Sequence, residues 1–304
     1  MTPDRYYLGV DGGGTKCRAR LRAADGTLLG EGLGGPANIR LGLDRAWSSI
    51  LEATHAALAQ AGLDPSIFPR LHVGLGLAGI VTPTDSIRTR AAGPAFACLA
   101  AETDAHAACL GAFSGRDGAI LIAGTGSAGY ALIGGRGHAV GGWGFEVSDE
   151  GSGASIGREA IRLALRAHDN LAPETGLTRQ IRDRLGGTPA AVVGWVNDAG
   201  PADYGRLAPD VLAHAAKGDA VACSIISGAA KELETYIRHL HALGAPNLCL
   251  MGGLSAPLTP WLSPWARSLL VEPEGDALEG ALLMARQAAP RDITQRPIAK
   301  SALP

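Results

Sequence analysis

The sequence predicts an α/β protein made of two related domains, and three observations carry this prediction. An apolar segment at 6–10 leads through a glycine turn into a segment at 17–23, where apolar residues alternate with arginines. A second apolar segment, at 119–123, leads through another glycine turn into a return strand about 110 residues later. Each copy then continues into strands and helices in the same order. We therefore predict a duplicated fold with a cleft between its two domains.

The first predicted domain covers residues 1–115 and begins with a β-meander. Asp25-Gly26 is typical of a hairpin turn, and a third strand reaches about Gly32. Gly62 and Pro65 end the first long helix. The expected elements after the meander are a helix at 43–60, a strand at 71–77, a loop at 80–85 with a short helix behind it, a strand at 97–101 and a helix from Asp104.

The second predicted domain covers residues 116–289, and 290–304 is expected to form a loose tail because it holds three prolines and little apolar content. Asp276 and Glu279 resemble a capping box that opens the last helix. The expected elements are strands at 119–123, 129–133 and 247–251, and helices at 152–168, 177–185, 205–216, 219–242 and 277–287.

Composition excludes several classes of function. The chain has 304 residues, 46% of them hydrophobic, so it can bury a sizeable core, and its net charge of −2 gives no reason to expect a nucleic-acid partner or a membrane surface. No window reaches the roughly 18 uncharged apolar residues of a membrane span, and the N-terminus lacks an apolar signal region. The five cysteines lie in apolar segments without a Cys-x-x-Cys pair, which favours buried free thiols and a cytoplasmic location.

The first glycine turn has the residue types of a phosphate-binding loop. It joins two strands, whereas the two commoner phosphate loops run from a strand into a helix, and Thr-Lys stands where a Walker loop needs Lys-Ser/Thr. Backbone N–H groups could contact phosphate oxygens, and Asp11 could act through a hydrated Mg²⁺. The alternative is a tight structural hairpin capped by Asp11. The candidate nucleotide ligands here are Gly12, Gly13, Gly14, Thr15 and Lys16.

A second loop of the same kind follows the strand at 119–123. Its residues are Gly124, Thr125, Gly126 and Ser127. One such loop is a common hairpin, but two facing loops at the ends of duplicated sheets could hold a polyphosphate from both sides. The Gly252-Gly253 pair after the strand at 247–251 could let an adenine lie against backbone, or it could simply end the strand.

Asp104 is the candidate catalytic base. It follows the strand at 97–101 at the start of a helix, where Thr103 could serve as the cap. The carboxyl ends of strands in open α/β sheets are where ligands collect, and a carboxylate there could deprotonate a substrate hydroxyl during phosphoryl transfer. An ordinary helix N-terminal aspartate is the alternative.

A glycine-rich segment around an aromatic residue could form the wall of a sugar site. Trp143 stands between Gly142 and Gly144, and Asp149 and Glu150 follow before a helix. The carboxylates could accept hydrogen bonds from vicinal hydroxyls. A buried tryptophan with first-turn acids is the alternative, and both interpretations can hold at once. Asn38, in a polar loop after the first hairpin, is a further candidate or a turn residue.

Taken together, these motifs resemble the N-acetylglucosamine kinase family, a branch of the group that includes the ATPase subunits of benzoyl-CoA reductase. The resemblance covers about 5–289 and implies the actin-like (ribonuclease H-like) ATPase fold. It also implies ATP- and Mg²⁺-dependent phosphorylation of a small amino sugar at its 6-hydroxyl, with Asp104 as the base. The implied sugar ligands are Asn38, Thr125, Ser127, Gly142, Trp143 and Asp149, with Asp11 at the metal and Gly252 and Gly253 at the adenosine.

Several questions stay open from the sequence. We expect N-acetylglucosamine ahead of glucosamine, but a Glu146 carboxylate aimed at the sugar nitrogen would favour the ammonium of glucosamine. The oligomeric state is open, with a homodimer as one option. Two other functions are an ATP-driven activator of a radical dehydratase or reductase, which would hold an iron–sulfur cluster through cysteines, and a non-catalytic sugar sensor. The buried cysteines argue against the first and Asp104 against the second.

Overall fold

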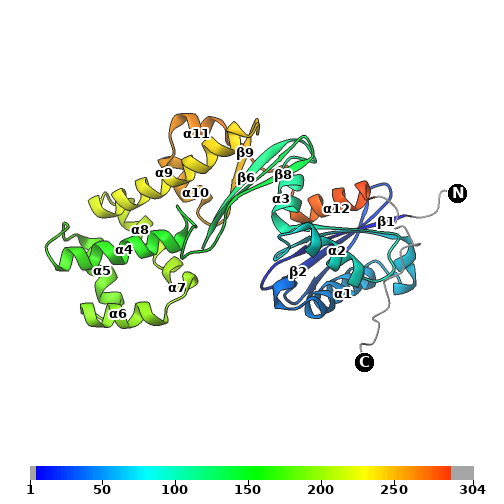
Figure 1. Cartoon of the computed structure of the whole chain (residues 1–304), viewed down its shortest axis with the longest axis horizontal. Helices are drawn as coiled ribbons and strands as arrows, with labels where there is room; N and C mark the ends of the chain where they lie inside the picture. The colour runs from blue at the N-terminus through cyan, green and yellow to red at the C-terminus, as the bar shows by residue number, and fades with distance from the viewer. Residues whose placement is uncertain (1–4, 289–304) are drawn as a thin grey trace, which may run out of the picture. The chain divides into compact units, whose positions relative to one another are not determined.

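A computed structural model describes residues 5–288, and the chain divides into two compact units (Figure 1). The first unit runs to Arg116 and takes up the chain again from Pro273. The second unit is continuous from Asp117 to Glu272. The first boundary lies within two residues of the predicted one, and the second differs because the end of the chain returns to the first unit.

The first unit is built on a mixed five-stranded sheet with the order β3-β2-β1-β4-β5. The three strands of the meander pair antiparallel, and β4 and β5 join β1 in parallel. The strands are β1 (Tyr6–Gly12), β2 (Cys17–Ala23), β3 (Leu28–Gly34), β4 (Leu71–Leu77) and β5 (Cys98–Thr103). All five were predicted from the sequence, within two residues at each end that was predicted.

Helix α1 (Leu43–Gln60) covers one face of this sheet (Figure 1). Three alternate glycines of β3 let it approach, because a Cβ on Gly30, Gly32 or Gly34 would lie only 2.0–2.2 Å from a carbonyl oxygen of α1. Trp47 and Ile50 of α1 are buried together with Leu8 and Val10 of β1. The first core therefore lies between α1 and the sheet.

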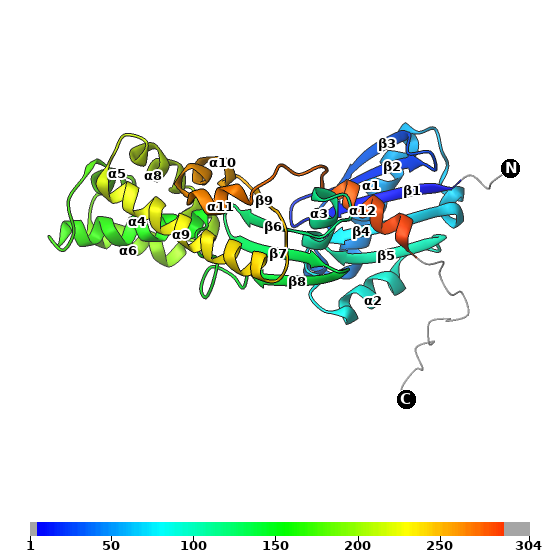
Figure 2. The ribbon, with the colours of Figure 1, turned by 90° about the horizontal axis from the view of Figure 1, so that it is seen from above.

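The opposite face is covered by α3 (Asp104–Ala112) and by α12 (Ala277–Gln287), the last helix of the chain (Figure 2). A Cβ on Gly9 of β1 would lie 2.5 Å from the Leu278 carbonyl oxygen, and one on Gly74 of β4 would lie 2.0 Å from that of Ala281. The prediction that α12 belongs to the second domain, 116–289, was therefore wrong. The glycines of β1 and β4 have no side chains on this face of the first sheet, so the backbone of α12 can pack directly against these strands. The predicted tail, 290–304, lies outside the described residues.

The remaining elements of the first unit are short. Helix α2 (Pro83–Ala92) starts inside the predicted loop at 80–85, because Thr82 and Asp85 form a capping box there. Two 3-10 turns, η1 (Ile39–Leu41) and η2 (Pro65–Arg70), precede α1 and β4.

The second unit repeats the topology with one strand fewer. Its sheet has the order β8-β7-β6-β9, with β6–β7 and β7–β8 antiparallel and β6–β9 parallel. A single parallel bridge between Leu248 and Leu270 stands beside β9, in the position that β5 takes in the first sheet. The strands are β6 (Gly118–Ala123), β7 (Ser127–Ile133), β8 (Arg136–Gly141) and β9 (Leu248–Met251).

Helices make up most of the second unit. The predicted helix at 205–216 is α8, which starts three residues later, and α6, α7, α10 and α11 were not predicted. Helix α6 follows a Thr188 cap with proline at its first position, which is a start signal that the sequence contained. The helices are α4 (Gly153–His168), α5 (Gly176–Arg184), α6 (Pro189–Asp198), α7 (Pro201–Gly205), α8 (Ala208–Ala215), α9 (Ala220–Ala242), α10 (Ser255–Leu258), α11 (Pro264–Ser268) and the 3-10 turn η3 (Thr259–Trp261).

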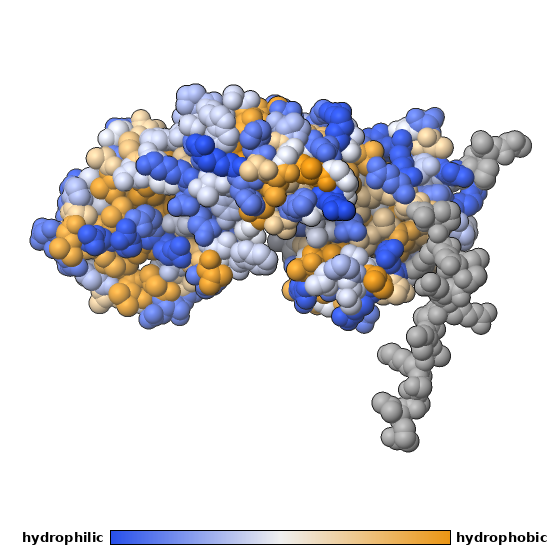
Figure 3. All heavy atoms as spheres, turned by 45° about the horizontal axis from the view of Figure 1, so that its top comes forward, coloured by the Kyte–Doolittle hydropathy of each residue, from blue (hydrophilic) through white to orange (hydrophobic). Residues whose placement is uncertain are grey.

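The two units have separate cores, and the visible surface of each carries apolar patches among polar side chains (Figure 3). All five cysteines lie in the described part of the chain and none of them forms a disulfide there; four are buried as predicted, and Cys223 is half-buried. Within residues 5–288, no helix is both long enough and apolar enough to cross a membrane.

Candidate nucleotide and substrate site

Three parallel strands of the first sheet end at the same level. The strand register places Gly12 of β1 beside Leu77 of β4, and Leu77 beside Thr103 of β5. Asp11 stands one residue before this level and Asp104 one residue after it. The fold thus brings the predicted metal carboxylate and the predicted base to one edge of the sheet, where open α/β sheets bind ligands.

The first glycine loop is a four-residue turn at this edge. The Gly13 N–H donates to the Lys16 carbonyl oxygen at 3.0 Å. Gly12 is a buried strand residue, since a Cβ there would lie 2.6 Å from Leu77 Cδ2, so its role is close packing. A Cβ on Gly14 would meet nothing within 4 Å, and Thr15 and Lys16 are exposed. The apex of the turn therefore has open space in which backbone could contact a ligand.

Asp11 makes an ion pair with Arg18. Arg18 donates to Oδ2 of Asp11 from Nε at 3.2 Å and from Nη2 at 2.7 Å. The described residues contain no cluster of three or more His, Cys, Asp or Glu side chains that could hold a metal ion. Mg²⁺ in proteins is commonly held by one or two carboxylates together with water and phosphate, and Asp11 is a carboxylate of this kind.

Asp104 opens helix α3 in the predicted manner. Thr103 is the N-cap, and its Oγ1 accepts from the His106 N–H at 2.9 Å. Oδ1 of Asp104 accepts from the Ala105 N–H at 2.8 Å. The side chain keeps contact with solvent, yet the protein around it raises the pKa of Asp104 through desolvation; the Ala105 N–H opposes this, and the Asp11 carboxylate adds to it. A carboxylate with a raised pKa is a better proton acceptor than an ordinary aspartate.

The loop that carries Asn38 is tied to the same edge. The Ala37 N–H donates to the Gly13 carbonyl oxygen at 3.0 Å, and the Ile39 N–H donates to that of Ala78 at 3.2 Å. Oδ1 of Asn38 accepts from the Arg40 N–H at 2.9 Å and so caps η1. Asn38 is therefore the turn residue of a loop that lies at the same sheet edge as the candidate base.

The second glycine loop lies against the start of α4. The Gly124 N–H donates to the Gly126 carbonyl oxygen at 2.9 Å, which closes the turn. The carbonyl oxygens of Gly124 and Thr125 accept from Gly153 and Ala154 of α4, at 2.8 and 3.1 Å. Thr125 is exposed, and its side chain is left to face solvent or a ligand.

The Gly252-Gly253 pair lies beside this loop. Strands β6 and β9 are neighbours, and the Leu254 N–H donates to the Ala123 carbonyl oxygen at 3.0 Å. Gly252 has a φ of +95°, and a Cβ there would lie 2.4 Å from the same oxygen. Both glycines are exposed. The structure thus groups the predicted adenosine motif with the second phosphate motif.

Exposure distinguishes between the interpretations of two residues of the predicted sugar motif. Trp143 is 73% exposed, so the alternative of a buried tryptophan is wrong. Ser127 is buried, and its hydroxyl donates to the Glu150 carbonyl oxygen at 2.7 Å, so it holds the loop and does not face a sugar. The prediction that Ser127 binds the substrate directly needs this correction.

Asp149 is held in a strained backbone conformation against the second loop. Its φ is +65°, which is uncommon outside glycine. A Cβ on Gly126 would lie 2.8 Å from Asp149 Oδ2, so any side chain there would displace this carboxylate. Gly142, also at positive φ, would place a Cβ 2.9 Å from that of Ala128. The predicted sugar residues Thr125, Gly142 and Asp149 therefore share one end of the second sheet.

Two contacts in these regions were missed by sequence reasoning. Tyr236 of α9 donates from its hydroxyl to Oε2 of Glu150 at 2.7 Å, and this hydrogen bond lowers the pKa of Glu150. The Arg18–Asp11 pair was missed too, although its signal was present: the two residues are direct cross-strand partners in a hairpin centred on the glycine turn. Glu146 is exposed in the turn that the Ser148 N–H closes on the Gly144 carbonyl oxygen at 2.7 Å.

The duplicated sheets, each with a glycine hairpin at the end of its first strand, define the actin-like ATPase fold. The chain belongs to the BadF/BadG/BcrA/BcrD ATPase family, which matches residues 8–285. It is 42% identical over 280 residues to a glucosamine kinase, GspK, of Vibrio cholerae, covering 92% of this chain and 95% of that protein.

Two further relatives carry related names. A solved structure from Chromobacterium violaceum, provisionally named an N-acetylglucosamine kinase, is 38% identical with a TM-score of 0.80, over 92% of this chain and 99% of that one. An N-acetylmuramic acid/N-acetylglucosamine kinase of Clostridium acetobutylicum is 29% identical over 252 residues, covering 75% of this chain and 77% of that protein.

Proposed function

We propose that this chain is an ATP-dependent amino-sugar kinase. The observation that carries the proposal is the register of β1, β4 and β5, which sets Asp104 at the same sheet edge as the open turn after Asp11. A base beside a phosphate loop is the arrangement that phosphoryl transfer to a hydroxyl requires. Family membership and the 42% identical kinase support the same activity.

The base in this proposal is Asp104, acting on the 6-hydroxyl of the sugar. Asp104 accepts the hydroxyl proton as the sugar oxygen bonds to the γ-phosphorus, and the bond from that phosphorus to the bridging oxygen of ADP breaks. The raised pKa of Asp104 suits this step. The exposed Thr15 and Lys16, with the N–H group of Gly14, would contact phosphate oxygens, while the Gly13 N–H closes the turn on Lys16.

The second unit would supply the other nucleotide contacts and much of the sugar site. We assign the phosphates to Gly124, Thr125 and Gly126, and the adenosine to Gly252 and Gly253. A bound Mg²⁺ would neutralise charge on the phosphates, and Asp11 is the carboxylate placed to hold it through water.

The sugar contacts in this proposal combine hydrogen-bond acceptors with one apolar face. Asp149 would accept from vicinal hydroxyls, Trp143 would cover a face of the ring, and Asn38 and Thr125 would add polar contacts. The exposed Glu146 carboxylate near Trp143 in the chain would attract an ammonium group. With the name of the 42% identical relative, this makes glucosamine the first substrate to test and N-acetylglucosamine the second.

The test is ADP release with each sugar in saturating Mg·ATP. We expect the unmodified protein to turn over at least one amino sugar. We expect Asp104→Asn to bind the sugar but to lose turnover. If neither sugar raises ADP release above the ATP-only background, the amino-sugar kinase proposal fails. Analysis of the product by NMR would show whether the phosphate is on the 6-hydroxyl.

A further inference from the structure

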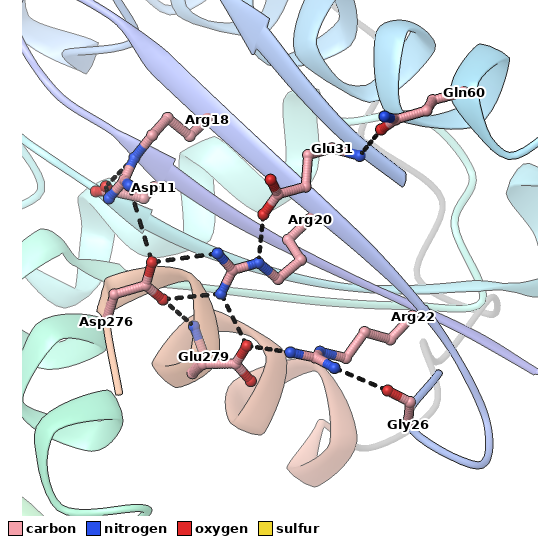
Figure 4. Close-up of polar contacts among 9 residues, drawn as sticks. All are labelled: Asp11, Arg18, Arg20, Arg22, Gly26, Glu31, Gln60, Asp276 and Glu279. Atoms are coloured by element: carbon pink, nitrogen blue, oxygen red, sulfur yellow. Dashed lines mark hydrogen bonds and ion pairs between the residues drawn. The ribbon is translucent and has the colours of Figure 1, made fainter. Parts of the chain in front are cut away.

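A row of arginines connects the first glycine loop to the last helix. Arg18, Arg20 and Arg22 alternate along β2, and they lie on the face of the sheet opposite α1 (Figure 4). Their partners are carboxylates at the start of α12, beside the glycine loop and, for Arg20, on β3, where Glu31 accepts at 2.7 Å. Arg20 and Arg22 both pair with Glu279, and Arg20 also pairs with Asp276.

Arg18 differs from the other two because it contacts the candidate metal carboxylate. Both of its hydrogen bonds to Asp11 end on the same oxygen, Oδ2. Its Nη1 lies 3.8 Å from Oδ2 of Asp276, which is the N-cap of α12 and accepts from the Glu279 N–H at 3.0 Å. The Arg18 guanidinium is therefore held between two carboxylates, one on each side (Figure 4).

The charge of Asp11 poses a problem for a phosphate site. A carboxylate beside the phosphate loop repels a polyphosphate until a divalent cation joins them. Arg18 offsets this charge at contact distance, and by binding one oxygen it leaves the other for a hydrated cation. The side chains are only partly exposed, 36% for Arg18 and 23% for Asp11, so solvent screens the pair incompletely.

We infer that Arg18 is a positioning residue with two effects on Asp11. It offsets the negative charge of Asp11 when a nucleotide binds without metal, and it orients the Asp11 carboxylate for the metal. Asp276 of α12 holds Arg18 in place. This inference rests on the proposed function, because it takes the turn after Asp11 as a phosphate loop. It assigns the C-terminal helix a role at the nucleotide site.

The experiment is calorimetric titration of ADP into the full-length protein, once with Mg²⁺ and once with EDTA. In Arg18→Met, the affinity for metal-free ADP is expected to fall about tenfold, whereas that for Mg·ADP changes less than about threefold, because the cation compensates Asp11. The ratio of the two dissociation constants is the readout, and a purely structural role would not move it.

Three variants make the test specific. Arg22→Met removes a matched arginine that pairs with α12 but not with Asp11, and the ratio is expected to stay unchanged. Arg18→Lys keeps the charge and is expected to restore metal-free affinity to within about threefold. In the Asp11→Asn protein, adding Arg18→Met is expected to leave the ratio of the two dissociation constants unchanged. If Arg18 instead contacted phosphate directly, the added substitution would still weaken ADP binding.

The outcomes separate the inference from the proposed function. If the unmodified protein binds neither ADP nor Mg·ADP, the proposed function fails. If it binds both and Arg18→Met leaves the ratio unchanged, or if Arg18→Lys is as impaired as Arg18→Met, the inference is overturned. Thermal unfolding of each variant identifies any that has failed to fold. If Arg18→Met does not fold, the test uses Arg18→Lys, and a loss of metal-free affinity greater than about threefold overturns the inference.

Discussion

The placement of the last helix on the first sheet can be tested at Gly280. This residue lies where α12 crosses α3, and a Cβ there would lie 1.8 Å from the Ala107 carbonyl oxygen and 2.7 Å from the Gly111 nitrogen. Both atoms belong to the backbone, so no side-chain rotation can relieve the overlap. Gly280→Ala must therefore push the two helices apart.

The expected magnitude follows from two opposing effects. Overpacking a close contact costs about 1–3 kcal/mol, and the rigid backbone on both sides places this site near the upper value. Replacing glycine by alanine within a helix stabilises it by about 1 kcal/mol. The net loss is about 2 kcal/mol, which corresponds to a melting temperature about 4–8 °C lower for a unit of this size.

The assay is thermal unfolding followed by far-UV circular dichroism. The matched control is Gly228→Ala on α9, where the added Cβ meets nothing within 4 Å and the residue is exposed. That variant is expected to be as stable as the unmodified protein or to melt up to about 2–4 °C higher. A Gly280→Ala melting temperature within about 1 °C of the unmodified protein would refute the packing of α12 on α3.

Further predictions concern the candidate site. Asp104→Asn is expected to lower kcat by about 10²–10⁴-fold, while the sugar Kd from calorimetry changes less than about threefold. A decrease in kcat of less than about tenfold would show that Asp104 is not the base. Because the base must be ionised and burial raises the pKa of Asp104, kcat/KM is expected to rise with pH through a pKa above the ordinary aspartate value, a limb that Asp104→Asn should lack. Because the pKa of Asp104 is raised, its ionised carboxylate destabilises the folded protein above this pKa. Asp104→Asn is therefore expected to melt at a higher temperature than the unmodified protein at neutral pH. An unchanged or lower melting temperature contradicts the raised pKa. Gly126→Ala would set a Cβ 2.8 Å from Asp149 Oδ2 and is expected to raise the sugar KM about tenfold in steady-state assays, with an unchanged KM counting against Asp149 as a ligand. Tyr236→Phe removes the hydrogen bond to Glu150 and is expected to lower stability by about 1 kcal/mol in urea unfolding, whereas Thr235→Ala, its exposed neighbour, serves as the control.

The two hairpins show what could be predicted from local patterns. Alternation with a period of two residues, ended by glycines, placed β1 and β2 and also β6 and β7 at nearly their observed positions. Thr103 and Asp104 were predicted as a helix start because capping depends on residues three apart in the chain. Short-range hydrogen bonding determines these features, so a single sequence contains enough information to find them.

Features that depend on distant segments were missed. Whether Gly12 packs or binds depends on Leu77 and Ala37, which crowd it from two other segments. Ser127 has the residue type of a sugar ligand, but the carbonyl of Glu150 takes its hydroxyl. Each of these outcomes depends on which atoms of distant segments lie opposite the residue after folding. The spacing of residues along the chain does not contain that information.

The sequence by itself determined the duplicated strand–turn–strand pattern, the two glycine loops and the candidate base, because backbone geometry and capping are local. Only the tertiary structure decided that α12 closes the first unit and that Arg18 joins Asp11 to Asp276. Those contacts arise from shape, since glycines on β1, β4 and α3 leave room for one helix from the far end of the chain. Its N-terminal carboxylates then face the arginines of β2, and this complementarity exists only between folded surfaces.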